Sequence, residues 1–331
     1  MVPELPRQLA LLIEAAEQLG YSWKTIDPHS NNLIEVSNGK QSFFANNGSV
    51  GVYPTNRQFS AGVVKDKAWT KQILRRHGFT IIEGDYAFIR EEYREMRGDG
   101  KERPDALAYA KQLGYPVFVK PNDKTKGIGA AIVYDETQLN QQLDALARLS
   151  HIALIEKVID QPEYRLLVVN GRIEYAYRKE PARLIGDGIK TIADLLTDHN
   201  QKLQPKYHVR DDNTFFQQQL KENGYRLASV LPKNESLFIS AANNLSTGAR
   251  LADYTEQFTP ACRAWTKRLV ELFGLSVCGL DIFSPSGLDD PVAFTVIEIN
   301  QNPHLAGIYD AGKREKVLAI FTTVLREFFH E

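Results

Sequence analysis

The sequence has little cysteine and almost no net charge, and each shortage excludes a class of protein. Cys262 and Cys278 are the two cysteines among 331 residues, and their spacing fits no metal motif. Such sparse use suits a reducing cytoplasm. The 40 basic and 41 acidic residues give a formal net charge of -1, so no bulk field favours nucleic acid or an anionic membrane. We therefore expect no nucleic-acid partner and no membrane partner.

Long hydrophobic runs are also missing. No stretch approaches the roughly 20 apolar residues of a membrane span. The apolar run from Leu9 to Ala16 is interrupted by Glu14 and lacks the basic leader of a signal peptide. The sequence therefore predicts a cytoplasmic protein.

The remaining composition is that of a globular chain, with 43% hydrophobic and 24% charged residues. Its length predicts two or three lobes. Helical and strand patterns mix without strict βαβ alternation, which favours α+β lobes over one doubly wound sheet. Asn170-Gly171 predicts a hairpin turn, and Pro260–Phe273 reads as a clear helix. Residues 197–226 are polar and weakly periodic, which predicts a long loop or lid with one helix near residues 214–221.

Two strand patterns near the C-terminus carry acidic side chains. Asp281 lies late in the strand 277–283, and Glu298 and Asn300 lie in the strand 296–300. Alternation projects Glu298 and Asn300 from one face, while Ile297 and Ile299 are expected to face the core. Two carboxylates and an amide oxygen on adjacent strands would suit Mg²⁺ holding nucleotide phosphates. The alternative is an ordinary solvated polar face.

A lysine-bearing loop follows another short apolar strand. Lys120 ends the strand, Pro121 stops it, and residues 122–129 combine small residues with lysines. Glycines such as Gly127 and Gly129 let backbone N–H groups approach phosphate oxygens, and lysine supplies positive charge. The sequence contains neither GxxxxGK[ST] nor GxGxxG, so the loop is not a Walker loop. A plain hairpin loop is the alternative.

A strand and a charged turn near the middle of the chain could form a nucleotide-binding hinge. The strand 154–159 leads into residues 160–165, which include Pro162 and Glu163. Adenine could pair with the exposed backbone there, beside aliphatic side chains such as Ile159, and Glu163 could accept hydrogen bonds from ribose. An ordinary inter-lobe hinge with paired carboxylates is the alternative reading.

Taken in order, these segments resemble the ATP-grasp superfamily over about residues 60–315. The matching segments are 65–71, 116–121, 126–129, 156–164, 279–281 and 298–300. A closer resemblance lies in the segments 164–171, 180–182, 185–192 and 244–248, which look like the ATP-grasp module of cyanophycin synthetases and of bifunctional glutathione synthetases. The domains that accompany the module in those relatives do not occur in this sequence.

The resemblance implies an α+β ATP-grasp fold in which two lobes clasp ATP. It divides the chain into a short N-terminal α/β segment (1–64), a small lobe with the phosphate loop (65–155) and a large lobe with the metal and substrate site (156–331). The expected nucleotide contacts are Lys67, Lys120, the loop residues Lys126, Gly127 and Gly129, Glu156 with the backbone of Lys157 and Ile159, and Glu163. The expected cofactors are ATP and Mg²⁺, with Mn²⁺ as an alternative, and the metal ligands are Asp281, Glu298 and Asn300.

The resemblance also implies a ligase that activates a carboxylate as an acyl phosphate and joins it to an amine. Amino acids or short peptides are the expected partners, and a homo-oligomer is common among relatives. Candidates to stabilise the tetrahedral intermediate are Arg178, Lys179 and the backbone near Ser246 and Gly248. The sequence departs from the family pattern in two places. Lys179 stands where an arginine is usual, and Ala249 stands where a glycine is usual.

Three alternatives stay open at this point. The substrate could be a ribosomal or carrier-bound peptide, which would leave free amino acids with little turnover. The chain could instead be a non-catalytic ATP-binding regulator, although its intact acidic triplet argues against lost catalysis. A kinase that releases an acyl phosphate would form ADP without an amide product.

Overall fold

The computed structural model divides the chain into two compact units. Unit 1 comprises Met1–Glu174, Glu256–His304 and Leu318–Glu331, and unit 2 comprises Tyr175–Thr255 and Leu305–Val317. The residues that the structure describes are 4–27, 29–48, 50–92, 94–125, 127–203, 205, 208–240 and 250–330. Helices and antiparallel strand pairs occur in both units, so the predicted α+β class is confirmed.

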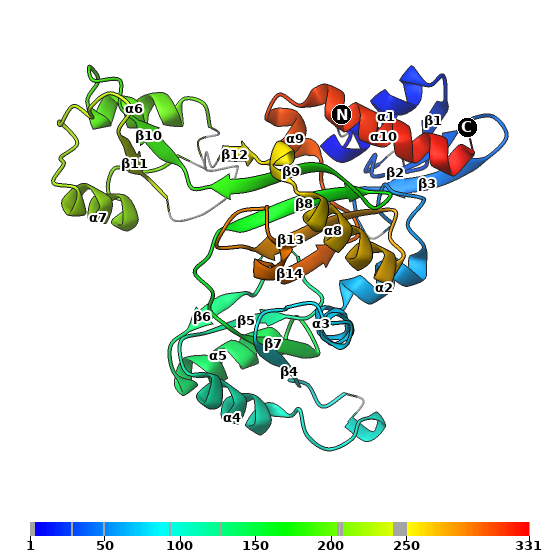
Figure 1. The fold of residues 1–331 in the computed structure, drawn as a ribbon, viewed down its shortest axis with the longest axis horizontal. Coiled ribbons are helices and arrows are strands. Elements are labelled where there is room, and N and C mark those ends of the chain that lie inside the picture. The colour runs from blue at the N-terminus through cyan, green and yellow to red at the C-terminus, as the bar shows by residue number, and fades with distance from the viewer. Residues whose placement is uncertain are drawn as a thin grey trace. The chain divides into compact units, whose positions relative to one another are not determined.

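The N-terminal part of unit 1 is a small α/β layer. Its elements are α1 (Arg7–Gln18), β1 (Ser22–Thr25), β2 (Leu33–Ser37), β3 (Ser42–Asn46) and α2 (Gln58–Lys65). The strands form an antiparallel sheet in the order β1-β2-β3. Phe43 of β3 meets Phe328 of the C-terminal helix α10 (Arg314–Phe329) edge to face, with ring centroids 4.9 Å apart. The two ends of the chain therefore pack together within unit 1 (Figure 1).

A four-stranded antiparallel sheet forms the next part of unit 1. Its strands run in the order β4-β7-β5-β6. They are β4 (Gly84–Phe88), β5 (Val117–Pro121), β6 (Ala131–Val133) and β7 (Ile152–Lys157). Helices α4 (Arg103–Leu113) and α5 (Glu136–Ala147) cover one face, where Leu139, Leu143 and Leu146 of α5 are fully buried against Val119 and Ile155 (Figure 1). Because strand side chains alternate, Lys120 and Glu156 point to the opposite face, toward α3 (Lys67–Arg76).

The third sheet region of unit 1 holds the acidic strands. Its strands are β8 (Glu163–Val169), β13 (Val277–Phe283) and β14 (Thr295–Asn300), and β13 lies between the other two. Helix α8 (Pro260–Phe273) precedes β13 and is confirmed with the predicted bounds. The predicted Asn170-Gly171 turn also forms. Both residues have positive φ, 50° and 72°, as a two-residue hairpin between β8 and β9 (Arg172–Glu180) requires.

One prediction for β14 is wrong. Ile299 is buried as expected, but Ile297 is only half-buried, and Val296 takes the other core position at 1% exposure. The cause is a bulge in the pairing with β13. Asp281 pairs with Glu298, whereas the next residue, Ile282, pairs with Val296. The extra residue shifts the alternation of the strand by one position.

Unit 2 has a core of its own. Its elements are the end of β9, β10 (Arg183–Ile185), α6 (Ile192–Asn200), α7 (Thr214–Glu222), β11 (Ser236–Phe238), β12 (Arg250–Asp253) and α9 (Ala306–Asp310). The helix predicted near residues 214–221 is confirmed as α7. The predicted long loop around it is not. Val209, Phe216 and Leu220 are buried in a cluster with Leu184 of β10 and Leu237 of β11. The described residues of the segment 197–226 thus contribute to a packed core in unit 2.

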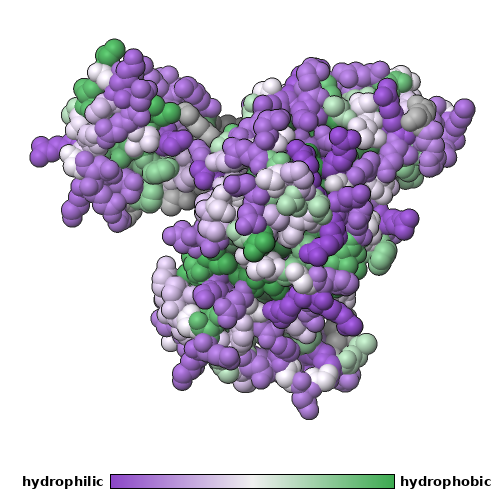
Figure 2. Space-filling model, viewed as in Figure 1, coloured by the Kyte–Doolittle hydropathy of each residue, from purple (hydrophilic) through white to green (hydrophobic). Residues whose placement is uncertain are grey.

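Hydrophilic residues cover most of the face seen in Figure 2. Among the described residues, no helix is both long enough and apolar enough to span a bilayer. Cys262 and Cys278 are both buried and unpaired. Burial raises the pKa of the Cys278 thiol to about 12, so this side chain serves the core rather than thiol chemistry.

Candidate active site

The first turn of α3 is joined to the end of β5 by one asparagine. The Asp66 carboxylate caps α3 by accepting from the Trp69 N–H at 2.8 Å. The Asn122 side chain accepts from the Ala68 N–H at 2.8 Å and donates to Asp66 at 2.6 Å. This arrangement fixes Lys67, the first residue of α3, whose Nζ donates to the Lys124 carbonyl at 2.8 Å. Lys67 is therefore held against the loop that follows β5.

A buried cluster of two lysines and one glutamate lies beside Lys67. Glu156 of β7 is 1% exposed. Its carboxylate oxygens lie 2.6 Å from Lys71 Nζ and 2.9 Å from Lys120 Nζ. Burial alone would raise the pKa of Glu156, but the two lysines outweigh it and hold the pKa below its usual value. Burial lowers the pKa of Lys71 to about 8. The cluster carries more cationic than anionic groups, so it attracts further negative charge.

The acidic triplet does converge. Asp281 and Glu298 are direct cross-strand neighbours, and Gly279 pairs with Asn300. The Asn300 amide donates to Glu298 at 3.0 Å and to Asp281 at 3.2 Å. Asp281 is 2% exposed, whereas the Glu298 side chain is 27% exposed. The set thus has one buried and one accessible carboxylate.

An arginine from the third strand also reaches this triplet. Arg165 of β8 stands opposite Asp281 in the sheet and forms a bidentate ion pair with it. One of its nitrogens lies 4.0 Å from Glu298. Gly279 allows this crowding, because a Cβ there would meet Pro303 at 3.2 Å and Asn300 at 3.6 Å. The side chains of the three strands therefore meet over a glycine.

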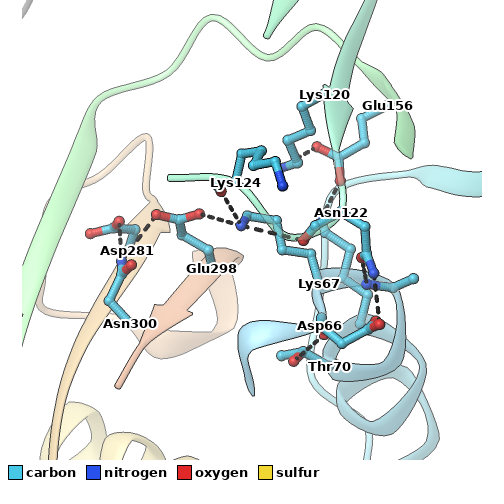
Figure 3. A network of polar contacts seen from close by, with 12 residues as sticks. Asp66, Lys67, Thr70, Lys120, Asn122, Lys124, Glu156, Asp281, Glu298 and Asn300 are labelled. Atoms are coloured by element: carbon cyan, nitrogen blue, oxygen red, sulfur yellow. Dashed lines mark hydrogen bonds and ion pairs between the residues drawn. The ribbon is translucent and has the colours of Figure 1, made fainter. Parts of the chain in front are cut away.

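Lys67 connects the lysine side to the acidic side. Its Nζ lies 3.8 Å from Glu298 Oε2, and Figure 3 shows the network running from Asn300 through Glu298 and Lys67 to Asn122. Burial lowers the pKa of Lys67, Glu298 opposes that shift, and Lys120 adds to it. One ammonium group is thus shared by the loop after β5 and the acidic strands.

The donor set fits a divalent cation that takes oxygen ligands. Two adjacent carboxylates and an amide are hard ligands of the kind that Mg²⁺ uses together with phosphate oxygens. Within the described residues, no group of three or more His, Cys, Asp and Glu side chains forms a metal site. Phosphate oxygens could complete the ligands of a metal held by these side chains. Arg165 and Lys67 balance the charge of the two carboxylates.

The loop after β5 is partly described. Gly127 and Gly129 both have positive φ, 71° and 72°. A Cβ on Gly129 would meet Leu146 of α5 at 2.8 Å, whereas a Cβ on Gly127 would meet nothing within 4 Å. Lys126 lies outside the described residues. Gly129 therefore anchors the loop on α5, while Gly127 lies in open space.

The hinge residues occupy the end of β7 and the start of β8. Lys157 ends β7, where its N–H donates to the Glu83 carbonyl at 2.9 Å and its side chain is exposed. Ile159 lies in the following connection, and Glu163 is the first residue of β8. The segment is thus irregular where adenosine contacts were predicted.

The residues predicted to act on the tetrahedral intermediate lie elsewhere in the chain. Arg178 belongs to unit 2, where it bonds to Glu180 at 2.6 Å. Lys179 lies in β9, and its side chain is not described. Ser246 and Gly248 lie outside the described residues. Their catalytic roles remain predictions.

Sequence reasoning gave no role to Arg165, Lys71 or Asn122. Lys71 could have been found, because it follows Lys67 by four residues and so shares its helix face. Arg165 could not, because its pairing with Asp281 joins positions 116 residues apart. In the sequence Asn122 has the pattern of a loop residue. Nothing in the neighbouring sequence indicates that its side chain links α3 to β5.

Comparison with known proteins supports the sequence resemblance. Residues 77–187 match a protein family described as the D-ala D-ala ligase C-terminus. A cyanophycin synthetase of Trichormus variabilis is 27% identical over 307 residues, which cover 88% of this chain and 32% of that protein. A glutathione biosynthesis bifunctional protein of Streptococcus mutans is 27% identical over 254 residues, which cover 72% of this chain and 32% of that protein. The chain thus spans about a third of these relatives.

Solved structures show the same fold. A bifunctional glutathione synthetase from Pasteurella multocida superposes with a TM-score of 0.66 at 22% identity, and the match covers 97% of this chain and 44% of that chain. A D-alanine–D-alanine ligase from Bacillus anthracis complexed with ATP gives a TM-score of 0.50 at 17% identity, covering 82% of this chain and 70% of that chain. The predicted resemblance to the ATP-grasp ligases is therefore confirmed, and the chain has the ATP-grasp fold.

Proposed function

We propose that the chain is an ATP- and Mg²⁺-dependent carboxylate–amine ligase that forms an amide bond through an acyl phosphate. One observation carries this proposal most directly. The Lys67 ammonium lies 3.8 Å from Glu298, so a cation suited to phosphate adjoins carboxylates suited to a metal. A nucleoside triphosphate with a divalent cation matches both at once. The names of the relatives, which are synthetases of amides and peptides, support the same chemistry.

In this proposal each part of unit 1 has a role. Lys67 and Lys120 hold nucleotide phosphates, and the loop Lys126–Gly129 covers them. The backbone of Lys157 and Ile159 receives adenine, and Glu163 receives ribose. We retain Glu156 beside the adenine, where its ion pairs with Lys71 and Lys120 fix its carboxylate. This assignment corresponds to a small lobe over residues 65–155 and a large lobe over residues 156–331, after the N-terminal segment 1–64.

The proposed reaction has two steps. A substrate carboxylate oxygen attacks the γ-phosphorus of ATP, and the bond to ADP breaks. An amine nitrogen then attacks the acyl carbon, loses a proton, and displaces inorganic phosphate. Asp281, Glu298 and Asn300 would hold Mg²⁺ (or Mn²⁺), which offsets negative charge on the phosphates. Arg178 or Lys179, with the backbone of Ser246 and Gly248, would stabilise the tetrahedral oxyanion.

The substrates we propose are amino acids or short peptides. The test is ADP release from ATP and Mg²⁺ with such compounds, given singly and in pairs, together with mass spectrometry of the products. We expect ADP and a condensed product that needs both members of one pair. ADP with an acyl phosphate alone would instead indicate a kinase. ATP binding without ADP from any pair would contradict a small-molecule ligase and favour a peptide carrier or a regulatory role.

A further inference from the structure

The backbone that follows β14, the strand of Glu298 and Asn300, is held by side chains from the N-terminal segment. The Gln301 carbonyl accepts from the Asn56 amide at 2.8 Å. Two residues later, the Pro303 carbonyl accepts from the Tyr53 hydroxyl at 2.6 Å and from the Gln8 amide at 3.0 Å. All of these residues belong to unit 1. The end of β14 is therefore anchored directly after Asn300.

Both the nitrogen and the oxygen of the Asn56 side-chain amide form hydrogen bonds to the backbone of the two strand ends. Its Nδ2 donates to the Val277 carbonyl at 2.7 Å as well as to Gln301. Its Oδ1 accepts from the Ser276 and Val277 N–H groups, each at 2.9 Å. One side chain thus ties the beginning of β13 to the end of β14.

The position of this tie matters because the two strands run antiparallel. Gly279 pairs with Asn300, and Asp281 pairs with Glu298. The carbonyls held by Asn56 lie two residues before Gly279 and one residue after Asn300. The side chain therefore acts at the strand end next to the acidic triplet, where a slip of one residue would turn every side chain to the other face.

Two of the three anchors, Gln8 and Tyr53, are buried, and Asn56 is half-buried. Gln8 is 1% exposed and Tyr53 is 6% exposed. The two side chains also bond to each other, from Gln8 Nε2 to the Tyr53 hydroxyl at 3.2 Å. The Tyr53 ring stacks on Phe321 of α10 with centroids 5.9 Å apart. Hydrogen bonds in such a setting are strong, and a lost donor leaves a buried carbonyl without a partner.

We propose that Asn56, assisted by Gln8 and Tyr53, is a positioning residue that sets the relative placement of Asp281, Glu298 and Asn300 for the metal–nucleotide complex. The proposal rests on the function proposed above, because it assigns the triplet to a metal. The N-terminal segment then has a defined task in the site without contacting the acidic side chains themselves.

The central variant is Asn56→Asp. It keeps the shape and the acceptor oxygen, but it places a carboxylate oxygen against the carbonyls of Val277 and Gln301. The matched control is Asn38→Asp in the same segment. Asn38 Oδ1 accepts from the Lys40 and Gln41 N–H groups in an exposed turn, and aspartate can keep both bonds. Tyr53→Phe is a milder second variant, which removes the hydroxyl that donates to Pro303.

The first measurement is hydrogen–deuterium exchange without metal or nucleotide. In Asn56→Asp we expect the amides at the start of β13 and the end of β14 to exchange about tenfold faster or more, as loss of local hydrogen bonds allows. Amides of β5 should keep their wild-type rates, as should all amides of Asn38→Asp. Tyr53→Phe should speed exchange around residues 301–303 alone. Wild-type rates in both variants, or equal acceleration in β5, would overturn the proposal.

The second measurement is the Mg²⁺ concentration that gives half-maximal ADP formation. We expect Asn56→Asp to raise it about tenfold or more, as is typical when groups behind metal ligands are lost, with a smaller loss of kcat at saturating Mg²⁺. An unchanged Mg²⁺ requirement would count against the positioning role. If the wild-type chain forms no ADP with any substrate, the proposed function fails, and the exchange rates still decide whether Asn56 holds the strand ends.

Discussion

The lysine cluster on the four-stranded sheet and the acidic triplet on β13 and β14 differ in how far their carboxylates are buried and how closely these are paired. Glu156 is 1% exposed and is enclosed by Lys71 and Lys120. Glu298 is 27% exposed and has its cationic neighbours, Lys67 and Arg165, at 3.8 and 4.0 Å. The first set is closed, and its one carboxylate has two lysine partners at short distance. In the second set Asp281 is tightly paired with Arg165, whereas Glu298 is loosely matched and accessible. Glu156 is therefore part of the packed interior, and Glu298 is the more accessible carboxylate.

Removing the central carboxylate of the closed cluster should have the largest effect. Glu156→Gln leaves two buried lysines without a counter-charge, and breaking such a pair costs about 3–5 kcal/mol. Urea unfolding followed by circular dichroism would measure the free energy of unfolding. Glu271→Gln is the control. Glu271 is exposed, with Lys267 as its partner at 3.7 Å, and this change should stay within about 0.5 kcal/mol of wild type. Equal stability of the two variants would show that the buried cluster does not depend on the charge of Glu156.

A change in the acidic triplet should lower activity more than it lowers stability. We expect Glu298→Gln to lower Mg²⁺-dependent ADP formation at least about a hundredfold, since even groups behind metal ligands are worth 10–100-fold. Its free energy of unfolding should change by about 1 kcal/mol or less, as for other partly exposed ion pairs. Steady-state ADP formation measures the loss of activity, and urea unfolding of the same sample measures the change in stability. Activity near the wild-type value would remove Glu298 from the metal site.

A third expected effect is a pH dependence within the closed cluster. The pKa of Lys71 in the folded chain is about 8, below its usual value of 10.5. Between these values the unfolded chain binds more protons, so the contribution of Lys71 to the free energy of unfolding rises with pH. The slope is at most about 1.4 kcal/mol per pH unit. Unfolding of the wild type and of Lys71→Met from pH 7 to 10.5 gives the difference curve. A flat curve would show that Lys71 titrates alike in both states.

Local sequence patterns predicted the arrangement of the acidic triplet better than that of the lysine cluster. Glu298 and Asn300 share a face because they are two residues apart in a strand, and this spacing is visible in the sequence. The Asn170-Gly171 turn was equally local. The ion pairs of Glu156 were not predictable, because Lys71 and Lys120 come from a helix and a strand that only the fold brings together. The nucleotide roles of Lys120 and Glu156 and the metal roles of Glu298 and Asn300 stay predictions.

The core of unit 2 and the burial of Val296 could not be predicted from the sequence, for related reasons. The core of unit 2 uses few apolar residues at irregular spacing, such as Val209, Phe216 and Leu220, so residues 197–226 lack a period. The burial of Val296 in place of Ile297 depends on a bulge whose position is set by the partner strand. Irregular cores and register shifts are properties of pairs of segments. A single stretch of sequence does not display them.

The same bulge separates two halves of β14 that answer to different constraints. Toward Asn300, the strand keeps strict register with β13, which places Glu298 opposite Asp281 and Asn300 opposite Gly279. Toward Thr295, the strand is out of phase by one residue, and Val296 fits the core. The extra residue in β14 interrupts the pairing, so the two halves of the strand need not shift together. Changes of length or packing on the Thr295 side can be taken up there, so the geometry around Glu298 can persist while the connection that leads into β14 diverges.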